Sequence, residues 1–282
     1  MANVSAQDRL QGVGGLAIFW QAWLPAGDPR AVVLIAHGAG EHSGRYGSLA
    51  ARLRRDGYAV YALDHRGHGR SEGPRALIDR MGHAVADLHT LAGLAHARHR
   101  SAACFLFGHS MGGTVALRYA IAHGAELRGL ILSGPLAAVE DAPAALRALV
   151  PVLSVLAPRM PLLAVDPQLV SRDPAVVQAY RSDPLVHHSK LPARTVAELA
   201  TTVASLPNTV GSIKTPTLIA YGTADRLCPP AGSLMLKERI GAADTTLRGY
   251  EGLAHEILNE PEQARVMDEI CAWIAERVSS AA

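Results

Sequence analysis

Short apolar runs, each ended by glycine, proline or charged residues, are the first regularity along this chain. Residues 31–36 form such a run, which is continuous rather than alternating and therefore predicts a strand covered on both faces. Similar runs predict further strands at 16–23, 58–63, 104–107 and 129–133. The pattern predicts a sheet that lies inside the molecule.

Between these runs, apolar residues recur at helical spacing. Tyr46, Leu49 and Leu53 share one face of such a segment, and Gly57 follows its charged end. A similar pattern predicts helices around 85–95 and 115–122, the second followed by glycine as a stop. Strands that alternate with helices favour a doubly wound, mostly parallel sheet.

The alternation breaks down between residues 135 and 206, which are rich in proline, alanine, leucine and valine. It resumes with predicted strands at 217–221 and 245–250, and with helices near 232–240 and 261–278. We therefore predict an α/β protein with a helical insertion after the sixth strand. Residues 1–135 and 207–282 would form the core domain, and residues 136–206 the insertion.

Composition and charge narrow the functional classes. The chain has 282 residues, of which 49% are hydrophobic and 18% charged, with a formal net charge of +2. The basic residues are scattered, so we expect no nucleic-acid partner. Three cysteines are too few for a disulfide framework, and no signal segment is visible, so we expect a cytoplasmic location. Residues 144–165 are apolar but broken by prolines and arginines, which excludes a membrane span.

A glycine-flanked serine stands between the strand at 104–107 and the helix after it. Gly108-His109-Ser110-Met111-Gly112 is a G-x-S-x-G pattern. Side chains at the two glycine positions would collide with the neighbouring strand and helix, and the helix N-terminus favours developing negative charge. A strand, a sharp turn and a helix are the context of a nucleophile elbow, so Ser110 is the predicted nucleophile.

A serine hydroxyl needs a histidine to take its proton and a carboxylate to orient that histidine. In this kind of fold the three follow the chain order Ser, acid, His. Asp225 follows the strand at 217–221, and His255 follows the strand at 245–250. Asp225 could otherwise be a turn residue or a helix cap. Glycine and proline follow the strand at 129–133, where the acid could also have stood. Ser110, Asp225 and His255 are therefore the predicted catalytic triad.

The oxyanion of a tetrahedral intermediate needs N–H donors. The backbone N–H of Met111, directly after the nucleophile, is one expected donor. The other is the N–H of Ala39, in the glycine-rich loop after the strand at 31–36.

Other polar groups predict structural roles. We expect the histidines on and around the helix at 85–95 to lie on a solvated face. They are His83, His89, His96 and His99. A metal site would also need acidic or thiol ligands beside them, which the sequence does not supply, so we expect no metal. Residues 64–71 predict a hydrogen-bonded structural loop rather than a phosphate-binding one. Cys228, close to Asp225, could border the substrate or fill the core.

Six segments carry a family resemblance. They are HGAGEHSGRY (37–46), DHRGHGRSEG (64–73), GHSMGG (108–113), DPLVHH (183–188), GTADRLC (222–228) and YEGLAHEILNEPE (250–262). Together they resemble the monoacylglycerol lipases of the α/β-hydrolase superfamily, most closely the bacterial members. The resemblance implies an α/β-hydrolase fold, the same triad and oxyanion hole, and a mobile helical cap over residues 136–206 whose apolar outer surface meets lipid aggregates.

The resemblance also bears on substrate contacts. Glu41 and Arg45 match polar residues near the entrance of the site, which could contact substrate or only anchor their loop. With Cys228 they are the candidate substrate-binding residues. In the mammalian enzyme a second histidine lies three residues after the catalytic one, whereas this chain has Leu258 there, so the glycerol contacts cannot be transferred.

These observations predict a serine hydrolase, without a cofactor, that cleaves monoacylglycerols to glycerol and fatty acid through an acyl-enzyme. Its partner would be a small lipid ester. The apolar segment at 144–165 would give transient or peripheral contact with membranes, although packing against the core explains it equally well. The alternatives are a broader carboxylesterase or lysophospholipase, a catalytically silent ligand-binding protein, and a perhydrolase or haloperoxidase side activity.

Overall fold

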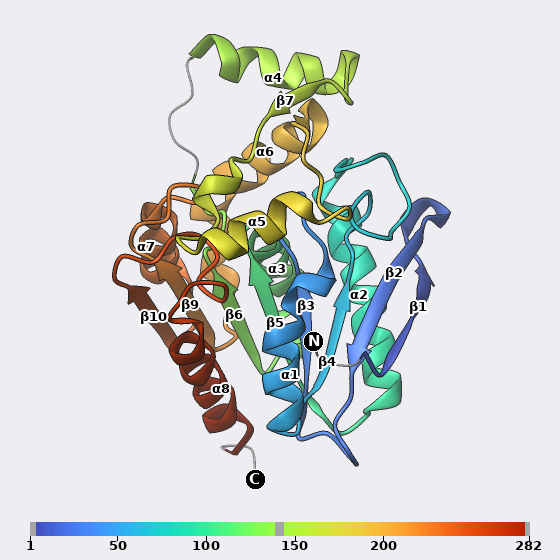
Figure 1. The fold of residues 1–282 in the computed structure, drawn as a ribbon, viewed down its shortest axis with the longest axis vertical. Coiled ribbons are helices and arrows are strands. Elements are labelled where there is room, and N and C mark those ends of the chain that lie inside the picture. The colour runs from blue at the N-terminus through green and yellow to red at the C-terminus, as the bar shows by residue number, and fades with distance from the viewer. Residues whose placement is uncertain (1–3, 139–143, 280–282) are drawn as a thin grey trace.

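A computed structural model describes residues 4–138 and 144–279, arranged around an eight-stranded sheet (Figure 1). The strand order is β1-β2-β4-β3-β5-β6-β9-β10. Strands β1 and β2 pair antiparallel with their neighbours, and the other pairs are parallel. The doubly wound, mostly parallel sheet predicted from the alternation is therefore confirmed. The strands are β1 Ala6–Gln11, β2 Ala17–Trp23, β3 Ala31–Ala36, β4 Ala59–Leu63, β5 Ala103–His109, β6 Gly129–Ser133, β9 Thr217–Gly222 and β10 Thr245–Tyr250.

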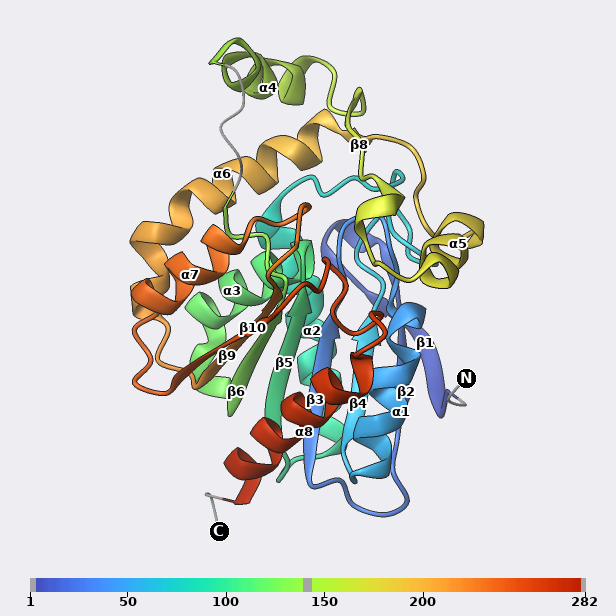
Figure 2. The ribbon, with the colours of Figure 1, turned by 60° about the vertical axis from the view of Figure 1, so that its left-hand side comes forward.

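Helices cover both faces of this sheet (Figures 1 and 2). Helices α1 and α8 bury Leu53 and Ile270 on one face. Helices α2, α3 and α7 bury Leu88, Leu117 and Leu236 on the other. The helices are α1 Gly47–Arg55, α2 Met81–Arg98, α3 Met111–His123, α4 Ala144–Leu156, α5 Pro174–Ser182, α6 Ala193–Thr209, α7 Pro230–Arg239 and α8 Gln263–Ser279.

The two helical layers explain why the inner strands are uniformly apolar. Every residue of β3 and of β4 is buried, because each face of these strands meets a layer of helices. Burying an aliphatic side chain of this kind stabilises the fold by roughly 1.5–3 kcal/mol. The central strands thus hold the loops at their carboxyl ends in fixed positions.

The first strand was not predicted from the sequence. Strand β1 reads AQDRLQ and has one buried residue, Leu10, because it is an edge strand that pairs only with β2. Its polar outer face hides the strand pattern. With β1 counted, β6 is the sixth strand, and the insertion follows it.

The insertion contains α4, α5 and α6 together with two short strands that the sequence pattern did not predict. These are β7 (Pro161–Leu163) and β8 (Leu191–Pro192), which pair antiparallel. Helix α6 runs through residue 206 with Pro207 inside it, so the predicted limit between insertion and core falls within a helix. The division into two domains stays a prediction.

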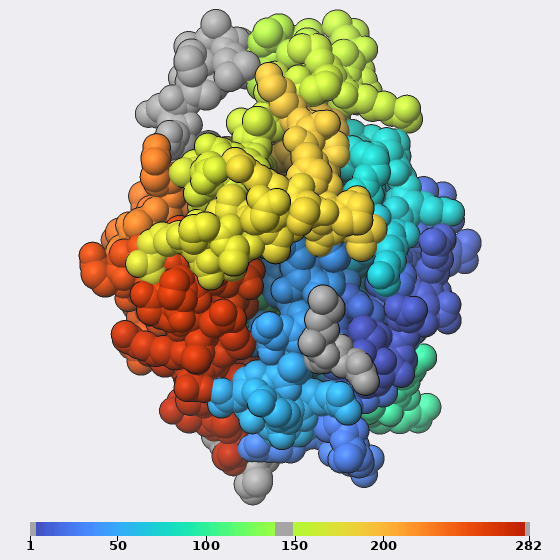
Figure 3. Space-filling model, in the orientation of Figure 1, coloured from blue at the N-terminus to red at the C-terminus, as the bar shows by residue number. Residues whose placement is uncertain are grey.

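The later part of the insertion is bonded to the core. The His187 N–H donates to the Gly40 carbonyl at 2.7 Å, and the Glu256 N–H donates to the Val170 carbonyl at 2.8 Å. The Thr195 hydroxyl donates to the Ala76 carbonyl at 2.7 Å. Helix α4, in contrast, packs on α6 and forms the top of the molecule (Figure 3). Within the described ranges, no helix is both long and apolar enough to span a membrane.

Candidate active site

Ser110 lies between β5 and α3 in a backbone conformation that few side-chain-bearing residues adopt. Its φ is 54° and its ψ is −121°. Such a conformation costs on the order of 1–3 kcal/mol and persists only where the surroundings impose it. The turn sets the serine at the N-terminus of α3, where backbone N–H groups favour negative charge. The predicted elbow is therefore present in the fold.

The two glycines of the elbow have no room for a side chain. A Cβ at position 108 would lie 2.4 Å from the Gly112 carbonyl oxygen. A Cβ at position 112 would lie 2.1 Å from the Ala36 carbonyl oxygen. These contacts are shorter than carbon and oxygen tolerate, so α3 can approach β3 and β5 this closely only with glycine at both positions.

Asp225 and His255 meet at the carboxyl ends of β9 and β10. The His255 Nδ1 lies 2.8 Å from the Asp225 Oδ2, and both side chains are buried. The other carboxylate oxygen of Asp225 accepts the N–H groups of Leu227 and Cys228 at 2.9 Å each. Because a carboxylate oxygen accepts, Nδ1 carries the proton, and Nε2 is left to accept one. This is the protonation state that a general base requires.

The end of β6 shows why the carboxylate does not come from that strand. Gly134 has a φ of 48°, and a Cβ there would lie 3.3 Å from the Asp225 Oδ2 and 3.1 Å from the His255 carbonyl oxygen. The backbone of Gly134 thus packs against the acid–histidine pair. A side chain at this position would push the pair apart.

The hydroxyl of Ser110 contacts the thiol of Cys228. The Ser110 Oγ lies 3.7 Å from the Cys228 Sγ, and among the described residues it makes no hydrogen bond to His255. Burial and the Asp225 carboxylate raise the pKa of the Cys228 thiol, which keeps it protonated. In this side-chain conformation the Ser110 hydroxyl has the thiol, rather than the His255 ring, as its partner among the described residues. Of the two roles left open for Cys228, bordering the substrate site is the one that its contact with Ser110 supports.

The two N–H groups expected to form the oxyanion hole are free of protein acceptors in the described part of the chain. Met111 is the first residue of α3, so its N–H has no partner within the helix. Ala39 lies in the loop after β3. Both groups can therefore donate to an oxyanion.

His37 fixes the peptide that carries the Ala39 N–H. The His65 backbone N–H donates to the His37 Nε2 at 2.8 Å, so the ring proton lies on Nδ1. That Nδ1 donates to the Gly38 carbonyl at 2.8 Å. In a planar trans peptide the Gly38 carbonyl and the Ala39 N–H point in opposite directions. Holding the carbonyl therefore sets the direction of the N–H.

Burial lowers the pKa of His37, so its ring stays neutral and keeps this tautomer. The same cause lowers the pKa of His109 to about 4, with a further contribution from His255. The His109 ring lies 4.6 Å from the His255 ring between centroids, and its Nδ1 is 2.9 Å from the Ser133 carbonyl oxygen. His109 is thus a neutral ring that packs against the His255 ring.

Comparison with known proteins assigns the family. The profile described as serine aminopeptidase, S33, matches residues 27–262. The monoacylglycerol lipase of Mycolicibacterium smegmatis is 41% identical over 275 residues, which cover 97% of this chain and 98% of the relative. The chain belongs to the monoacylglycerol lipase family.

Two further members of the monoacylglycerol lipase family agree with this assignment. The human monoglyceride lipase is 34% identical over 96% of this chain and 91% of its own. The crystal structure of the Paleococcus ferrophilus monoacylglycerol lipase superposes with a TM-score of 0.83 at 32% identity, covering 92% and 99% of the two chains. The α/β-hydrolase fold implied by the resemblance is confirmed.

In this member of the monoacylglycerol lipase family, the polar atoms of Glu41 and Arg45 form hydrogen bonds and ion pairs with other protein groups. Glu41 accepts from the Gly38 N–H at 2.5 Å and from the Tyr46 hydroxyl at 2.6 Å. Arg45 pairs with Glu41 and, through both terminal nitrogens, with Glu256. Burial alone would raise the pKa of Glu41, but Arg45 and nearby histidines outweigh it and lower this pKa to about 2.

A cavity of about 20 Å³ borders this network, and Leu258 lines it. It has room for about one water molecule and none for a glycerol group. The geometry therefore supports the alternative in which Glu41 and Arg45 anchor the loop after β3.

Several residues that shape this site were not predicted. Glu256 follows His255 and binds Arg45, and the Tyr180 ring of α5 stacks under the Arg45 guanidinium at 4.8 Å. His42 also links the loop after β3 to the insertion, because its Nε2 lies 2.9 Å from the Asp183 carboxylate. His42, Asp183 and Glu256 stand within the family segments 37–46, 183–188 and 250–262, which gave no indication of their partners. Tyr180 lies outside these segments, and the sequence carried no signal for it.

The loop at 64–71 has the hydrogen bonding that the sequence predicts. Asp64 accepts from the Ser43 N–H and hydroxyl, at 2.8 and 2.6 Å, and from the Arg70 N–H at 2.8 Å. It thereby ties the loop after β4 to the loop after β3, which carries Ala39.

Proposed function

We propose that this chain hydrolyses monoacylglycerols through an acyl-enzyme formed on Ser110. The observation that carries the proposal is a serine on a strained elbow, set beside a buried Asp225–His255 pair. The relatives named monoacylglycerol lipase, among them the one that is 41% identical over nearly the whole chain, support this substrate class.

The reaction follows from the protonation states. His255 Nε2 takes the proton of the Ser110 hydroxyl as Oγ attacks the ester carbonyl carbon. The N–H groups of Ala39 and Met111 donate to the oxyanion of the tetrahedral intermediate. Protonated His255 then gives its proton to the glycerol oxygen as the ester bond breaks. Water, deprotonated by the same Nε2, releases the fatty acid and restores Ser110.

A substrate panel tests this proposal. We expect the wild-type chain to hydrolyse monoacylglycerols with a higher kcat/KM than diacylglycerols, lysophospholipids or short p-nitrophenyl esters. The Ser110→Ala variant should lose this activity and its labelling by a fluorophosphonate probe. A preference for short activated esters would indicate a broader carboxylesterase. Ligand binding without labelling of Ser110 would indicate a silent binding protein.

We also propose that the outer surface of α4 and β7 contacts lipid aggregates. The support is a set of exposed apolar side chains, of which Val155 is 72% and Leu156 78% exposed. Leu149, Val152, Met160 and Leu163 are exposed alongside them. Apolar side chains gathered on one protruding segment suit a lipid surface, where burying each would gain roughly 1.5–3 kcal/mol.

Co-sedimentation with phosphatidylcholine vesicles tests this contact. We expect the double variant Val155→Ser/Leu156→Ser to sediment less than the wild type. Leu234→Ser is the matched control, since Leu234 is an exposed leucine on α7 in the core, and it should sediment as the wild type does. Equal sedimentation of all three proteins would contradict the proposal.

A further inference from the structure

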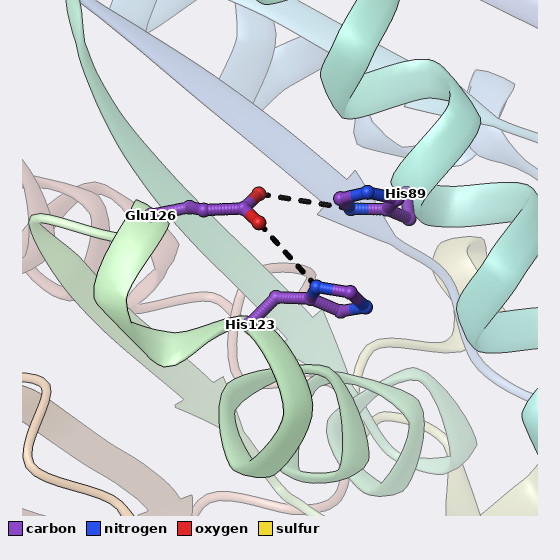
Figure 4. Close-up of side chains that lie close together, drawn as sticks. All are labelled: His89, His123 and Glu126. Atoms are coloured by element: carbon purple, nitrogen blue, oxygen red, sulfur yellow. Dashed lines mark ion pairs between the residues drawn. The ribbon is translucent and has the colours of Figure 1, made fainter.

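A cluster of three metal-ligating side chains lies outside the catalytic site. His89 comes from α2, His123 is the last residue of α3, and Glu126 ends the short 3-10 helix that follows (Gly124–Glu126) (Figure 4). Helix α3 has Ser110 at its other end. With 13 residues it separates the cluster from the nucleophile by roughly 20 Å, at 1.5 Å per residue.

The spacing of the ligand atoms suits one small cation. The Nδ1 atoms of His123 and His89 lie 3.4 and 3.6 Å from the two carboxylate oxygens of Glu126. All three ligand atoms lie within 4.8 Å of one another. Tetrahedral zinc with ligands at about 2.0–2.1 Å holds them about 3.3 Å apart, so small side-chain movements bring the atoms into range.

The two imidazole rings stack, with centroids 4.0 Å apart and planes 13° from parallel. A ligand nitrogen binds a metal in the plane of its ring, so the rings must tilt apart to share one ion. The side chains can make this movement, because their exposed fractions are 43% for His89, 30% for His123 and 52% for Glu126.

A buried tyrosine supports the carboxylate. The Tyr119 hydroxyl donates to Glu126 at 3.3 Å and lies 3.2 Å from the His89 Nδ1. Burial and the Glu126 carboxylate raise the pKa of Tyr119, so the hydroxyl keeps its proton. A donor that orients a ligating carboxylate in this way is a common partner of metal sites.

A cavity of about 280 Å³ adjoins His89, Tyr119 and Glu126. It leaves space for water, or for a small ligand, on the remaining coordination position of an ion. The histidines of α2 were expected to lack acidic company. That expectation is wrong for His89, because the fold places Glu126 beside it from a different helix. It is also wrong for His83, whose Nδ1 lies 2.8 Å from the Asp79 carboxylate.

We propose that His89, His123 and Glu126 bind one divalent transition-metal ion of the zinc class, joining α2 to the C-terminal end of α3. Two imidazole nitrogens favour Zn²⁺ over Mg²⁺ and Ca²⁺, which prefer oxygen ligands. The proposal is independent of the hydrolase activity, because the cluster takes no part in the reaction.

Isothermal titration of the chelator-treated full chain with ZnCl₂ and with MgCl₂ tests the site. We expect one Zn²⁺ ion to bind, and Mg²⁺ to bind at least about tenfold more weakly. His123→Asn and Glu126→Gln should each weaken Zn²⁺ binding by at least about tenfold. His96→Asn is the matched control, because His96 lines the same cavity on α2 but lies outside the cluster, and it should bind as the wild type does.

Thermal unfolding gives a readout that does not depend on titration heats. Saturating Zn²⁺ should raise the Tm of the wild type and of His96→Asn, and should leave the Tm of His123→Asn unchanged. Failure of the wild type to bind Zn²⁺ would overturn the proposal. Equal binding by the wild type and His123→Asn would also overturn it, because the ion would then lie at other histidines or thiols.

Discussion

The hydrogen bonds of His37 allow its two ring nitrogens to be tested separately. Asparagine places an amide nitrogen where Nδ1 lies, so His37→Asn can still donate to the Gly38 carbonyl but cannot accept from the His65 N–H. Glutamine reaches the position of Nε2, so His37→Gln keeps the acceptor and loses the donor. Both variants lose the imidazole ring, so each bears the cost of the missing volume, and this cost cancels when the two are compared.

The magnitudes follow from the bonds that are lost. In His37→Gln the Gly38–Ala39 peptide loses a bond whose net worth is about 0.5–1.5 kcal/mol, which lowers kcat by about 2–13-fold. Complete loss of one oxyanion donor, about 10²–10³-fold, is the upper limit. In His37→Asn the buried His65 N–H has no acceptor, which lowers the free energy of unfolding by about 1–3 kcal/mol.

Steady-state kinetics on a monoacylglycerol and urea unfolding of both variants measure these effects. We expect kcat to fall more in His37→Gln than in His37→Asn. KM should change little in His37→Gln. An equal loss of kcat in the two variants would refute this role of His37, because the loss would then come from the missing ring rather than from the orientation of the Ala39 N–H.

Three other expectations follow from the described geometry. Asp225→Asn should lower kcat by about 10³–10⁴-fold, because the amide no longer fixes the Nδ1–H tautomer of His255, and an unchanged kcat would remove Asp225 from the triad. Gly112→Ala should lower the free energy of unfolding by more than about 3 kcal/mol. Gly82→Ala, whose Cβ would meet nothing within 4 Å, should raise it by about 0.5–1 kcal/mol, and similar effects of the two would contradict the packing argument. Burial lowers the pKa of His68 to about 3 and that of His109 to about 4 from 6.5, so the unfolded state takes up protons first as the pH falls below about 6.5. Stability should then decline by about 1.4 kcal/mol per pH unit for each such histidine, and a urea midpoint that stays constant from pH 7 to 4.5 would contradict this.

The sequence was sufficient to propose the triad because topology constrains it. Strands β9 and β10 pair in parallel with Gly222 opposite Tyr250, so the loops after them leave the sheet side by side. Asp225 and His255 lie a few residues beyond these positions. Chain order and buried strand patterns carry this information, and both are legible in one sequence.

Contacts between distant segments were not predictable in the same way. Arg45 and Glu256 are 211 positions apart, and nothing in either loop identifies the other as its partner. His89 and Glu126 likewise meet only because α2 and α3 pack together. Strand β1 was missed because a polar edge strand lacks the apolar pattern on which the prediction rests.

The ion pair between Arg45 and Glu256 has a consequence for exchanging parts between homologues. A chimera that replaced the loop at 37–46 without the loop at 250–262 would leave a buried charge unpaired wherever the donor lacks its partner, which typically costs 3–5 kcal/mol. The two loops therefore have to be exchanged together, although they lie far apart in the sequence. Recombination within the family should conserve them jointly or replace them jointly.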